Sequence, residues 1–386
     1  MRVLVNALSA RMGGIVTYTN NLLDAFERRG IDVVVCVPRE FVTRDRPSVL
    51  RFDVGNYRSL RRFVWEQTAW RDIVRSFKPN VLFSSANFGL LRSPVKQILL
   101  LREGGLFDPF YLAHMTATQG VGYVVNRHFR RRLMLLSAAH ADHIITPTRA
   151  MRDMVAQWDP SILQRCTVNP YGTINEMFKP MPRQRRWRED GMLRMLYVSV
   201  YYPHKVPSLV CQAVDRLNAE GMRAHGRITM APQEFKEMSG STLDDLLVSD
   251  AHARGVITLG RHAYDKLPTL YNEHDVFVFP SVSETFGHPM AEAMSSGLPL
   301  AVADTPVNRE ICGDAAIYFP PFSVSGLVAA MRRLDENPDM RRQLAESGRA
   351  RAVERFGWDD HVDRLVATFD AVASGRVPTA LNWAEA

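Results

Sequence analysis

One stretch decides the fold class, and it reads Val276-Phe277-Val278-Phe279-Pro280-Ser281-Val282-Ser283-Glu284-Thr285-Phe286-Gly287-His288-Pro289-Met290-Ala291-Glu292-Ala293-Met294. Its β-branched and aromatic beginning predicts a buried strand over residues 276–279, followed by a turn that contains Gly287. Pro289 suits a first helical position, so a helix is predicted to begin at His288 or Pro289 and to end near Gly297. A strand, a turn and a helix in this order form one unit of a parallel α/β sheet.

The predicted helix start is also the strongest chemical signal in the chain. Free N–H groups and the positive end of the helix dipole would meet there, an arrangement that suits a diphosphate. Glu284 precedes the helix and Glu292 lies about one turn inside it, so both carboxylates can face one ligand. Carboxylates accept hydrogen bonds from vicinal hydroxyls, which sugars and ribose offer.

The same alternation of short apolar runs and longer helical stretches continues on both sides of this unit. In the first half, strands are predicted at residues 3–5, 33–37, 81–84, 98–101 and 144–146. In the second half, they are predicted at residues 196–200, 256–259, 276–279, 300–303 and 315–319, with helices at 207–218 and 325–334 among them. The sequence therefore predicts an α/β chain with two doubly wound parallel sheets that face a cleft.

The length of 386 residues also favours two domains. We expect an N-terminal domain over 1–180 and a C-terminal domain over 191–357, with the linker in the Pro- and Arg-rich stretch 171–190. A closing helix over 358–372 and a tail complete the chain to residue 386, and we expect them to pack back on the N-terminal domain.

Composition excludes several classes of protein. An apolar fraction of 46% and a charged fraction of 23% are those of an ordinary globular protein, not of a disordered or fibrous one. The four cysteines are far apart, which favours a reducing cytosol over a disulfide framework or a zinc site. Neither a signal peptide nor a membrane span is predicted.

The net positive charge belongs to the first half. Up to Asp190 there are 29 basic and 16 acidic residues, and after it 19 and 25, giving net charges of +13 and −6. Nucleic acid is disfavoured as a partner because no RNA- or DNA-binding signature accompanies the arginine clusters. An anionic membrane surface suits them better, and residues 126–136 read either as a surface-lying helix or as a core helix with a charged entrance.

The stretch around Glu284 and Glu292 resembles the donor-site signature of the retaining glycosyltransferases of family 4. The resemblance continues through Gly297-Leu298-Pro299, Arg309-Glu310-Ile311 and Gly313-Asp314-Ala315-Ala316, and covers most of the C-terminal half. It implies the two-domain GT-B fold, a nucleotide-sugar donor, and a catalytic Glu284 that binds hydroxyls of the donor sugar. It further implies that Glu292 binds the ribose and that the loop residues Thr285, Phe286, Gly287 and His288 contact sugar and phosphate, largely through main-chain amides. Whether the His288 imidazole does more than cap its helix stays open.

Lys205 is the second element of the resemblance. The run from Leu196 to Lys205 predicts a strand that ends in a loop delivering a lysine, similar to the phosphate-binding lysine of the family. We expect this ammonium to stabilise charge on the leaving diphosphate, as a second catalytic group. Many relatives carry an arginine a few residues earlier, whereas here no arginine follows Arg194 in that loop. The second phosphate cation is therefore not identified.

Two further elements lie in the N-terminal half. Gly13-Gly14 follows the first strand and lets main-chain N–H groups approach a phosphate, although a glycine pair alone can also form a simple turn. It is not the three-glycine dinucleotide fingerprint, so a nicotinamide enzyme is disfavoured. On the acceptor side, relatives often carry a histidine where this chain has Arg102 and Glu103. These two residues either bind a phosphate-bearing acceptor or pack together.

The resemblance implies transfer of a hexosyl group from a nucleotide diphosphate sugar to a hydroxyl of a glycan or lipid-linked acceptor, with retention and without a metal or other cofactor. The loop over 304–308 resembles polysaccharide and O-antigen assembly enzymes, which favours GDP-mannose as donor. The expected location is the cytoplasm, at the inner face of the membrane. A nucleotide-sugar epimerase and a non-catalytic nucleotide-sugar-binding protein are the competing interpretations, and the sequence does not predict the oligomeric state.

Overall fold

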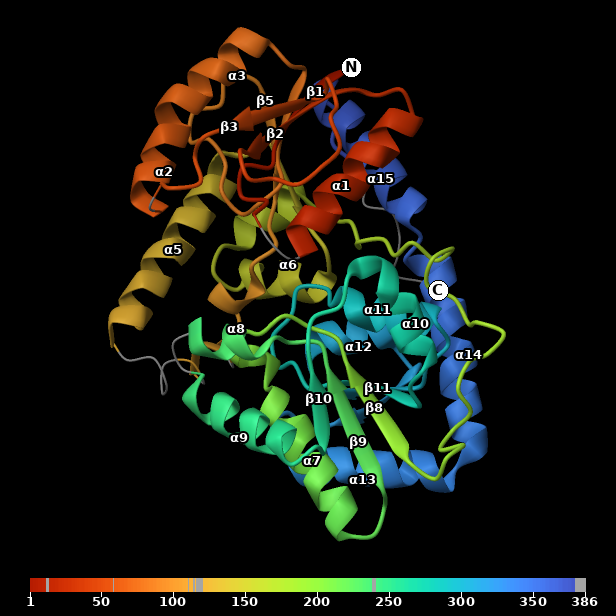
Figure 1. Cartoon of the computed structure of the whole chain (residues 1–386). Coiled ribbons are helices and arrows are strands. Elements are labelled where there is room, and N and C mark those ends of the chain that lie inside the picture. The colour runs from red at the N-terminus through yellow and green to blue at the C-terminus, as the bar shows by residue number, and fades with distance from the viewer. Residues whose placement is uncertain are drawn as a thin grey trace. The chain divides into compact units, whose positions relative to one another are not determined.

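The computed structural model describes residues 1–11, 14–57, 59–109, 111–113, 115, 121–237 and 241–378 (Figure 1). The chain forms two compact units. Unit 1 comprises Met1–Phe107, Val125–Pro170 and Asp359–Ala386, and unit 2 comprises Asp108–Val124 and Tyr171–Trp358. Each unit is built around a parallel sheet of its own.

Unit 1 contains a seven-stranded sheet in the order β3-β2-β1-β4-β5-β6-β7, with all neighbouring strands parallel. Its strands are β1 (Arg2–Asn6), β2 (Asp32–Pro38), β3 (Val49–Phe52), β4 (Val81–Ser84), β5 (Lys96–Leu100), β6 (His143–Thr146) and β7 (Cys166–Val168). Its helices are α1 (Gly14–Arg28), α2 (Ser59–Trp65), α3 (Arg71–Phe77), α5 (Val121–His140), α6 (Arg149–Ala156) and α15 (Trp358–Ala373), with shorter turns η1 (Glu66–Trp70), η2 (Gly104–Leu106) and η3 (Pro160–Arg165). Helices α5 and α15 each begin with residues of unit 2.

The apolar residues of unit 1 form buried clusters on this sheet. One cluster joins Leu4 and Leu82 to Trp70 and Val74, and another joins Leu99 to Met134 and Ala138 of α5. Helix α15 is fixed to unit 1 by aromatic contacts. The ring of Phe369 lies 5.1 Å from that of Phe83 and 6.4 Å from that of Phe26. The final helix is therefore an integral part of this unit.

Unit 2 contains a six-stranded parallel sheet in the order β10-β9-β8-β11-β12-β13. Its strands are β8 (Leu193–Tyr197), β9 (Ala224–Ile228), β10 (Ile257–Leu259), β11 (Val276–Phe279), β12 (Leu300–Ala303) and β13 (Ala316–Phe319). Its helices are α7 (Pro207–Ala219), α8 (Pro232–Glu237), α9 (Thr242–Ala253), α10 (Leu267–Asn272), α11 (His288–Ser295), α12 (Pro306–Cys312), α13 (Val324–Glu336) and α14 (Pro338–Arg355), with 3-10 turns η4 (Pro203–Lys205) and η5 (Tyr264–Lys266).

The burial of the strands in unit 2 shows where helices cover the sheet. All residues of β11 and β12 are buried, as expected for strands covered on both faces. In β9, buried and half-buried residues alternate, with Gly226 packed against α7 and its neighbours His225 and Arg227 on the opposite face. One face of the sheet is thus polar at β9.

The predicted fold class, an α/β chain with two doubly wound parallel sheets, is confirmed by both strand orders. Strands β3, β7 and β9 escaped the sequence analysis. The reason is clearest at β9, where one sheet face lacks apolar side chains and the periodic signal is therefore weak. Among the described residues, no helix combines the length and apolar character that crossing a bilayer requires.

The stretch 171–190 is not an isolated connector. It belongs to unit 2, including residues 171–180, which the sequence analysis assigned to the N-terminal domain. Phe178 is fully buried, with its ring 5.8 Å from that of Tyr271. The Arg185 guanidinium is 6% exposed and pairs with Asp275 and Asp190. The proline and arginine content of the stretch suggested a linker, but Phe178 and Arg185 anchor it to the rest of unit 2.

Candidate functional site

The candidate site lies at the topological switch point of the sheet in unit 2. Strands β8 and β11 are neighbours, and the chain leaves them toward opposite edges of the sheet. The loops that follow these two strands therefore diverge at the carboxyl ends of the strands, the place where open α/β sheets bind ligands. The backbone N–H of Val282 donates to the carbonyl of His204 at 3.0 Å, which ties the two loops together. Lys205 lies in one loop and Glu284 in the other.

Lys205 is positioned by the turn that connects β8 to α7. It ends η4, and its carbonyl accepts a hydrogen bond from the buried Tyr197 hydroxyl at 2.8 Å. The next residue, Val206, has φ +45° and ψ +53° and precedes the first residue of α7. A β-branched residue rarely adopts this left-handed conformation, so the turn stores backbone strain beside the site. Such strain is common where structure holds a functional group in place.

Lys205 and Glu284 form an ion pair through Nζ and Oε1. Their side chains are 12% and 10% exposed, so each charge has its counter-ion in a poorly solvated place. The ammonium also lies 5.6 Å from the centre of the Phe279 ring. Burial and the Glu284 carboxylate together raise the pKa of Tyr197, which keeps that phenol neutral. The pair offers a ligand both hydrogen-bond donors and acceptors at one point.

Helix α11 begins at His288, as predicted from the sequence. Gly287 precedes it with φ +82°, and a Cβ added there would lie 2.5 Å from Cε of Met290. The position therefore favours glycine on conformational grounds, whereas Cε is the flexible end of the Met290 side chain and can move aside. The first turn of a helix carries N–H groups without helical partners, and these can bind an anion. Thr285, half-buried, completes the loop between Glu284 and the buried Phe286.

The His288 ring belongs to an aromatic cluster. It stacks on Tyr171 with ring centres 4.9 Å apart and an angle of 20° between the planes. Phe286 meets His288 edge-on at 5.2 Å and Tyr171 at 5.5 Å, and Phe356 closes the cluster at 5.3 Å from Phe286. This packing fixes the orientation of the imidazole at the helix start.

Glu292 is 5% exposed and lies within α11. Its Oε2 accepts a hydrogen bond from the Tyr271 hydroxyl at 2.8 Å. Burial raises the pKa of this carboxyl to about 7, although hydrogen bonds from Tyr271 and Tyr264 hold it lower than burial alone would. A carboxyl that titrates near neutrality in a buried place is typical of functional sites. That Glu292 and Glu284 contact one ligand stays a prediction.

The tyrosines around the site were not identified from the sequence. Tyr171 comes from the stretch interpreted as a linker, and Tyr264 and Tyr271 come from η5 and α10. No motif marks these residues, because their contacts with His288 and Glu292 arise only when distant segments pack together. A local signal is visible only at Tyr197, which ends the strand before the Lys205 loop.

The candidate residues of unit 1 lie at the carboxyl ends of its own strands. Gly14 begins α1, after β1, whereas Gly13 lies outside the described residues. Glu103 pairs with Arg127 at 3.4 Å and with Arg130 at 2.7 Å, both on α5. The Arg102 guanidinium lies 5.7 Å from the centre of the Tyr18 ring. Glu103 thus links α5 to the segment that follows β5.

Two family models together match most of the chain. Residues 12–173 match the model described as Glycosyltransferase Family 4, and residues 183–351 match the model described as Glycosyl transferases group 1. The chain belongs to glycosyltransferase family 4. The resemblance noted in the sequence is therefore confirmed, and it extends to both halves of the chain.

Two curated relatives and one solved structure are similar to this chain. The chain is 24% identical to the O-antigen chain mannosyltransferase RfbU of Salmonella typhimurium over 82% of this chain and 80% of that protein. It is 30% identical to the MMP alpha-(1->4)-mannosyltransferase of Mycolicibacterium hassiacum over 53% of this chain and 47% of that protein, so that match spans about half the relative's length.

The solved structure is a sucrose-phosphate synthase from Thermosynechococcus elongatus, with a TM-score of 0.79 at 16% identity. The match covers 97% of this chain and 100% of that one. This similarity supports the predicted GT-B fold. It concerns the fold and not the function.

Proposed function

We propose that this protein transfers a hexosyl group from a nucleotide diphosphate sugar to an acceptor hydroxyl, with retention at the anomeric carbon. One observation carries the proposal: the Lys205–Glu284 ion pair at the switch point of unit 2. Glu284 shortly precedes the start of α11 in the sequence. Crevices at such switch points bind nucleotides in open α/β sheets. An ammonium and free helix amides suit the diphosphate, and a carboxylate suits the hydroxyls of the sugar.

Each residue of the site then has a separate role. Glu284 accepts hydrogen bonds from the donor sugar, and Glu292 accepts them from the ribose. Lys205 binds the diphosphate together with the amides of the loop from Thr285 to His288, and a phosphate contact at Gly14 stays a prediction from the sequence. The Tyr171 ring supports the loop through its stacking on His288.

The reaction breaks the bond between the anomeric carbon and the diphosphate oxygen, and forms a bond to the acceptor oxygen on the same face of the sugar. The transition state is oxocarbenium-like, with negative charge growing on the diphosphate. Lys205 and the helix start are placed to stabilise that charge, so no metal or other cofactor is required in this proposal. The leaving phosphate takes the proton of the acceptor hydroxyl.

GDP-mannose is the proposed donor. Both curated relatives described above are named mannosyltransferases, which supports a mannosyl group over other hexoses. Contacts to the base in such sites run largely through the main chain, so the side chains do not distinguish guanosine from uridine. A panel of nucleotide sugars therefore belongs in the first experiment.

A glycan or lipid-linked acceptor at the inner face of the cytoplasmic membrane is proposed for unit 1. Arg102 and Glu103, which follow β5, are proposed to contact it. One stripe of α5 carries exposed apolar side chains, with Val125 62%, Phe129 52% and Leu136 41% exposed. Arg131, in contrast, is buried over the Trp158 ring. An outward apolar stripe among arginines suits an anionic membrane surface.

Incubation with GDP-mannose and UDP-sugars, with membrane lipids as acceptors, tests the proposal. A glycosylated product with retained anomeric configuration, identified by proton NMR, is expected. Lys205→Ala and Glu284→Ala are expected to abolish detectable transfer, while the exposed controls Lys236→Ala and Glu336→Ala retain it. Isomerised donor would instead indicate an epimerase, and binding without turnover would indicate a non-catalytic protein. Wild-type turnover in either site variant would overturn the residue assignment.

Membrane association is tested separately with vesicles. Binding is expected to increase with the content of anionic lipid and to weaken with salt. Phe129→Ser should weaken it, because this change removes the most bulky exposed side chain of the stripe. Binding that does not depend on lipid charge or salt would contradict the proposed role of this surface.

A further inference from the structure

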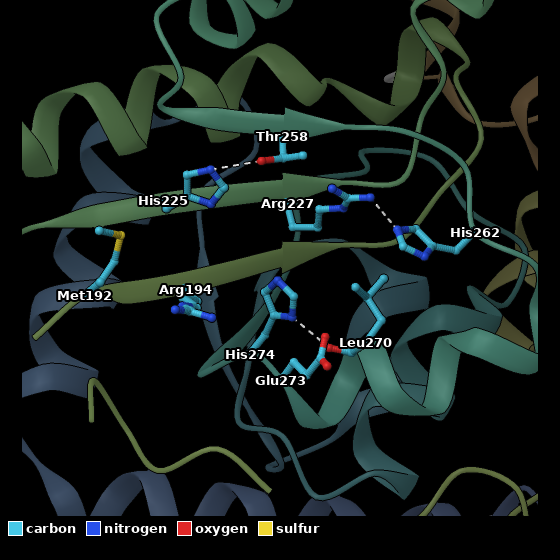
Figure 2. A pocket seen from close by; sticks show the side chains of 9 residues that line it. All are labelled: Met192, Arg194, His225, Arg227, Thr258, His262, Leu270, Glu273 and His274. Carbon is cyan, nitrogen blue, oxygen red and sulfur yellow. Dashed lines mark hydrogen bonds between the residues drawn. The ribbon is translucent and has the colours of Figure 1, made fainter. Parts of the chain in front are cut away.

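A second polar site lies on the open sheet face of unit 2. Arg194 of β8, Arg227 and His225 of β9, and Thr258 of β10 project from neighbouring strands (Figure 2). The opposite face of β9 is apolar, because Gly226 lies against Val210, Val214 and Ile257. The alternation along the strand thus separates a packed face from one that gathers charge.

These side chains line a hollow of about 460 Å³. Two more histidines reach it from the connections that follow β10, His262 before α10 and His274 after it, as Figure 2 shows. Lys205, Glu284 and Glu292 do not line this hollow. Its size suits a small ligand.

Arg227 is the main cation of this hollow. Its Nη2 and the Nε2 of His262 form a hydrogen bond. A guanidinium can only donate, so Nε2 of His262 must accept and this imidazole must be neutral. The Nε of Arg227 is buried without a hydrogen-bond partner, and no carboxylate of the described residues lies within 4.0 Å of its guanidinium. Burial accordingly lowers the pKa of Arg227.

Arg185 and Arg194 of the same unit have the carboxylate partners that Arg227 lacks. The guanidinium of Arg185 is also buried, and two carboxylates, Asp275 and Asp190, neutralise it. Arg194 pairs with Asp190 at 2.7 Å. Arg227 has only a neutral imidazole. A partly buried cation without a counter-ion is costly, and a bound anion removes that cost.

The two guanidinium groups also affect the pKa of the three histidines. Burial lowers the pKa of His225, His262 and, to about 4, His274. Arg194 and Arg227 lower it further at His225 and His274, and Arg227 does so at His262. Glu273 acts in the opposite direction on His262. Because two guanidinium groups face the hollow, a metal cation is disfavoured as its ligand.

We infer that this pocket binds a small phosphate-bearing anion through Arg227, with His225, His262 and His274 as supporting donors. Planar guanidinium groups match the oxygens of a phosphate, and each imidazole that gains a proton adds a charge-assisted hydrogen bond. The inference does not rest on the proposed transferase reaction, since it uses none of the donor-site residues.

Two probes test the inference, inorganic phosphate and sulfate. Sulfate keeps its double charge over the pH range used, so any pH dependence belongs to the protein. Histidine ring resonances of the full chain are followed by NMR during each titration, at constant ionic strength set with sodium chloride. Saturable shifts at His225, His262 and His274 are expected, with tighter sulfate binding at about pH 5 than at about pH 8, because His225 and His262 gain charge only as the pH falls toward their lowered pKa.

Variants assign the binding to Arg227. Arg227→Gln is expected to weaken sulfate binding at least about tenfold, because a charge-assisted donor pair is lost. Arg227→Lys keeps a charge and should retain part of the affinity, and Arg216→Gln on α7 is the exposed control with unchanged affinity. Thermal unfolding checks that each variant folds. Shifts that chloride reproduces, or unchanged affinity in folded Arg227→Gln, would overturn the inference.

Discussion

The buried carboxyl of Glu292 makes the stability of this protein depend on pH in a way that one substitution removes. The pKa of this carboxyl is about 7 in the folded chain, against 4.5 for an ordinary glutamate. Between these two values the folded chain holds a proton that the unfolded chain has lost. Raising the pH through this window therefore destabilises the fold. Each factor of ten in proton affinity corresponds to about 1.4 kcal/mol, so the complete loss is about 3 kcal/mol.

Glu292→Gln removes this contribution because an amide does not ionise. Relative to the wild type, the variant should gain about 3 kcal/mol of stability between about pH 5 and about pH 8. Buried histidines such as His143 and His274, whose pKa burial lowers to about 4, give the opposite slope. They are present in both proteins and cancel in the difference.

Urea unfolding of wild type and Glu292→Gln, followed by circular dichroism at several pH values, measures this difference. Glu336→Gln is the matched control, since its carboxyl is exposed, and its curve should run parallel to that of the wild type. If the Glu292→Gln curve also runs parallel to the wild type, the carboxyl does not titrate near neutrality and the reasoning fails.

Three further predictions concern the same site. Lys205→Met and Glu284→Gln each leave a mostly buried charge without its counter-ion and should cost about 2 kcal/mol, less than for a fully buried pair. The double variant should cost less than the sum, and urea unfolding of the four proteins checks this. Gly287→Ala places an alanine at φ +82° and should cost about 1–2 kcal/mol, measured by the same unfolding. Tyr271→Phe removes a hydrogen bond that lowers the pKa of Glu292, so the pH midpoint of nucleoside diphosphate binding should move upward, as a calorimetric titration at several pH values would show.

Much of the fold could be predicted because buried parallel strands consist of short continuous runs of apolar residues. The predicted strands at residues 81–84, 276–279 and 300–303 coincide with β4, β11 and β12, each buried along its length. The start of α11 was likewise marked by local chemistry, a glycine that adopts a left-handed conformation and a proline that follows. Where one sheet face is open, as at Arg227 of β9, that signal disappears.

The pairing of Lys205 with Glu284 lies between these cases. The two residues are 79 positions apart, so no local pattern joins them. Yet once strand order is given, the loops after β8 and β11 must meet, since these strands are neighbours at the switch point. The contact therefore follows from topology combined with two short motifs.

The contacts of the tyrosines cannot be predicted in this way. Tyr171 and Tyr271 contact His288 and Glu292 through the packing of a loop and of a short helix, and neither follows from strand order. These contacts hold the His288 ring and help to set the pKa of Glu292. The position of a candidate site can thus be predicted from its motif, whereas the orientation and pKa of its groups depend on contacts that exist only in the folded chain.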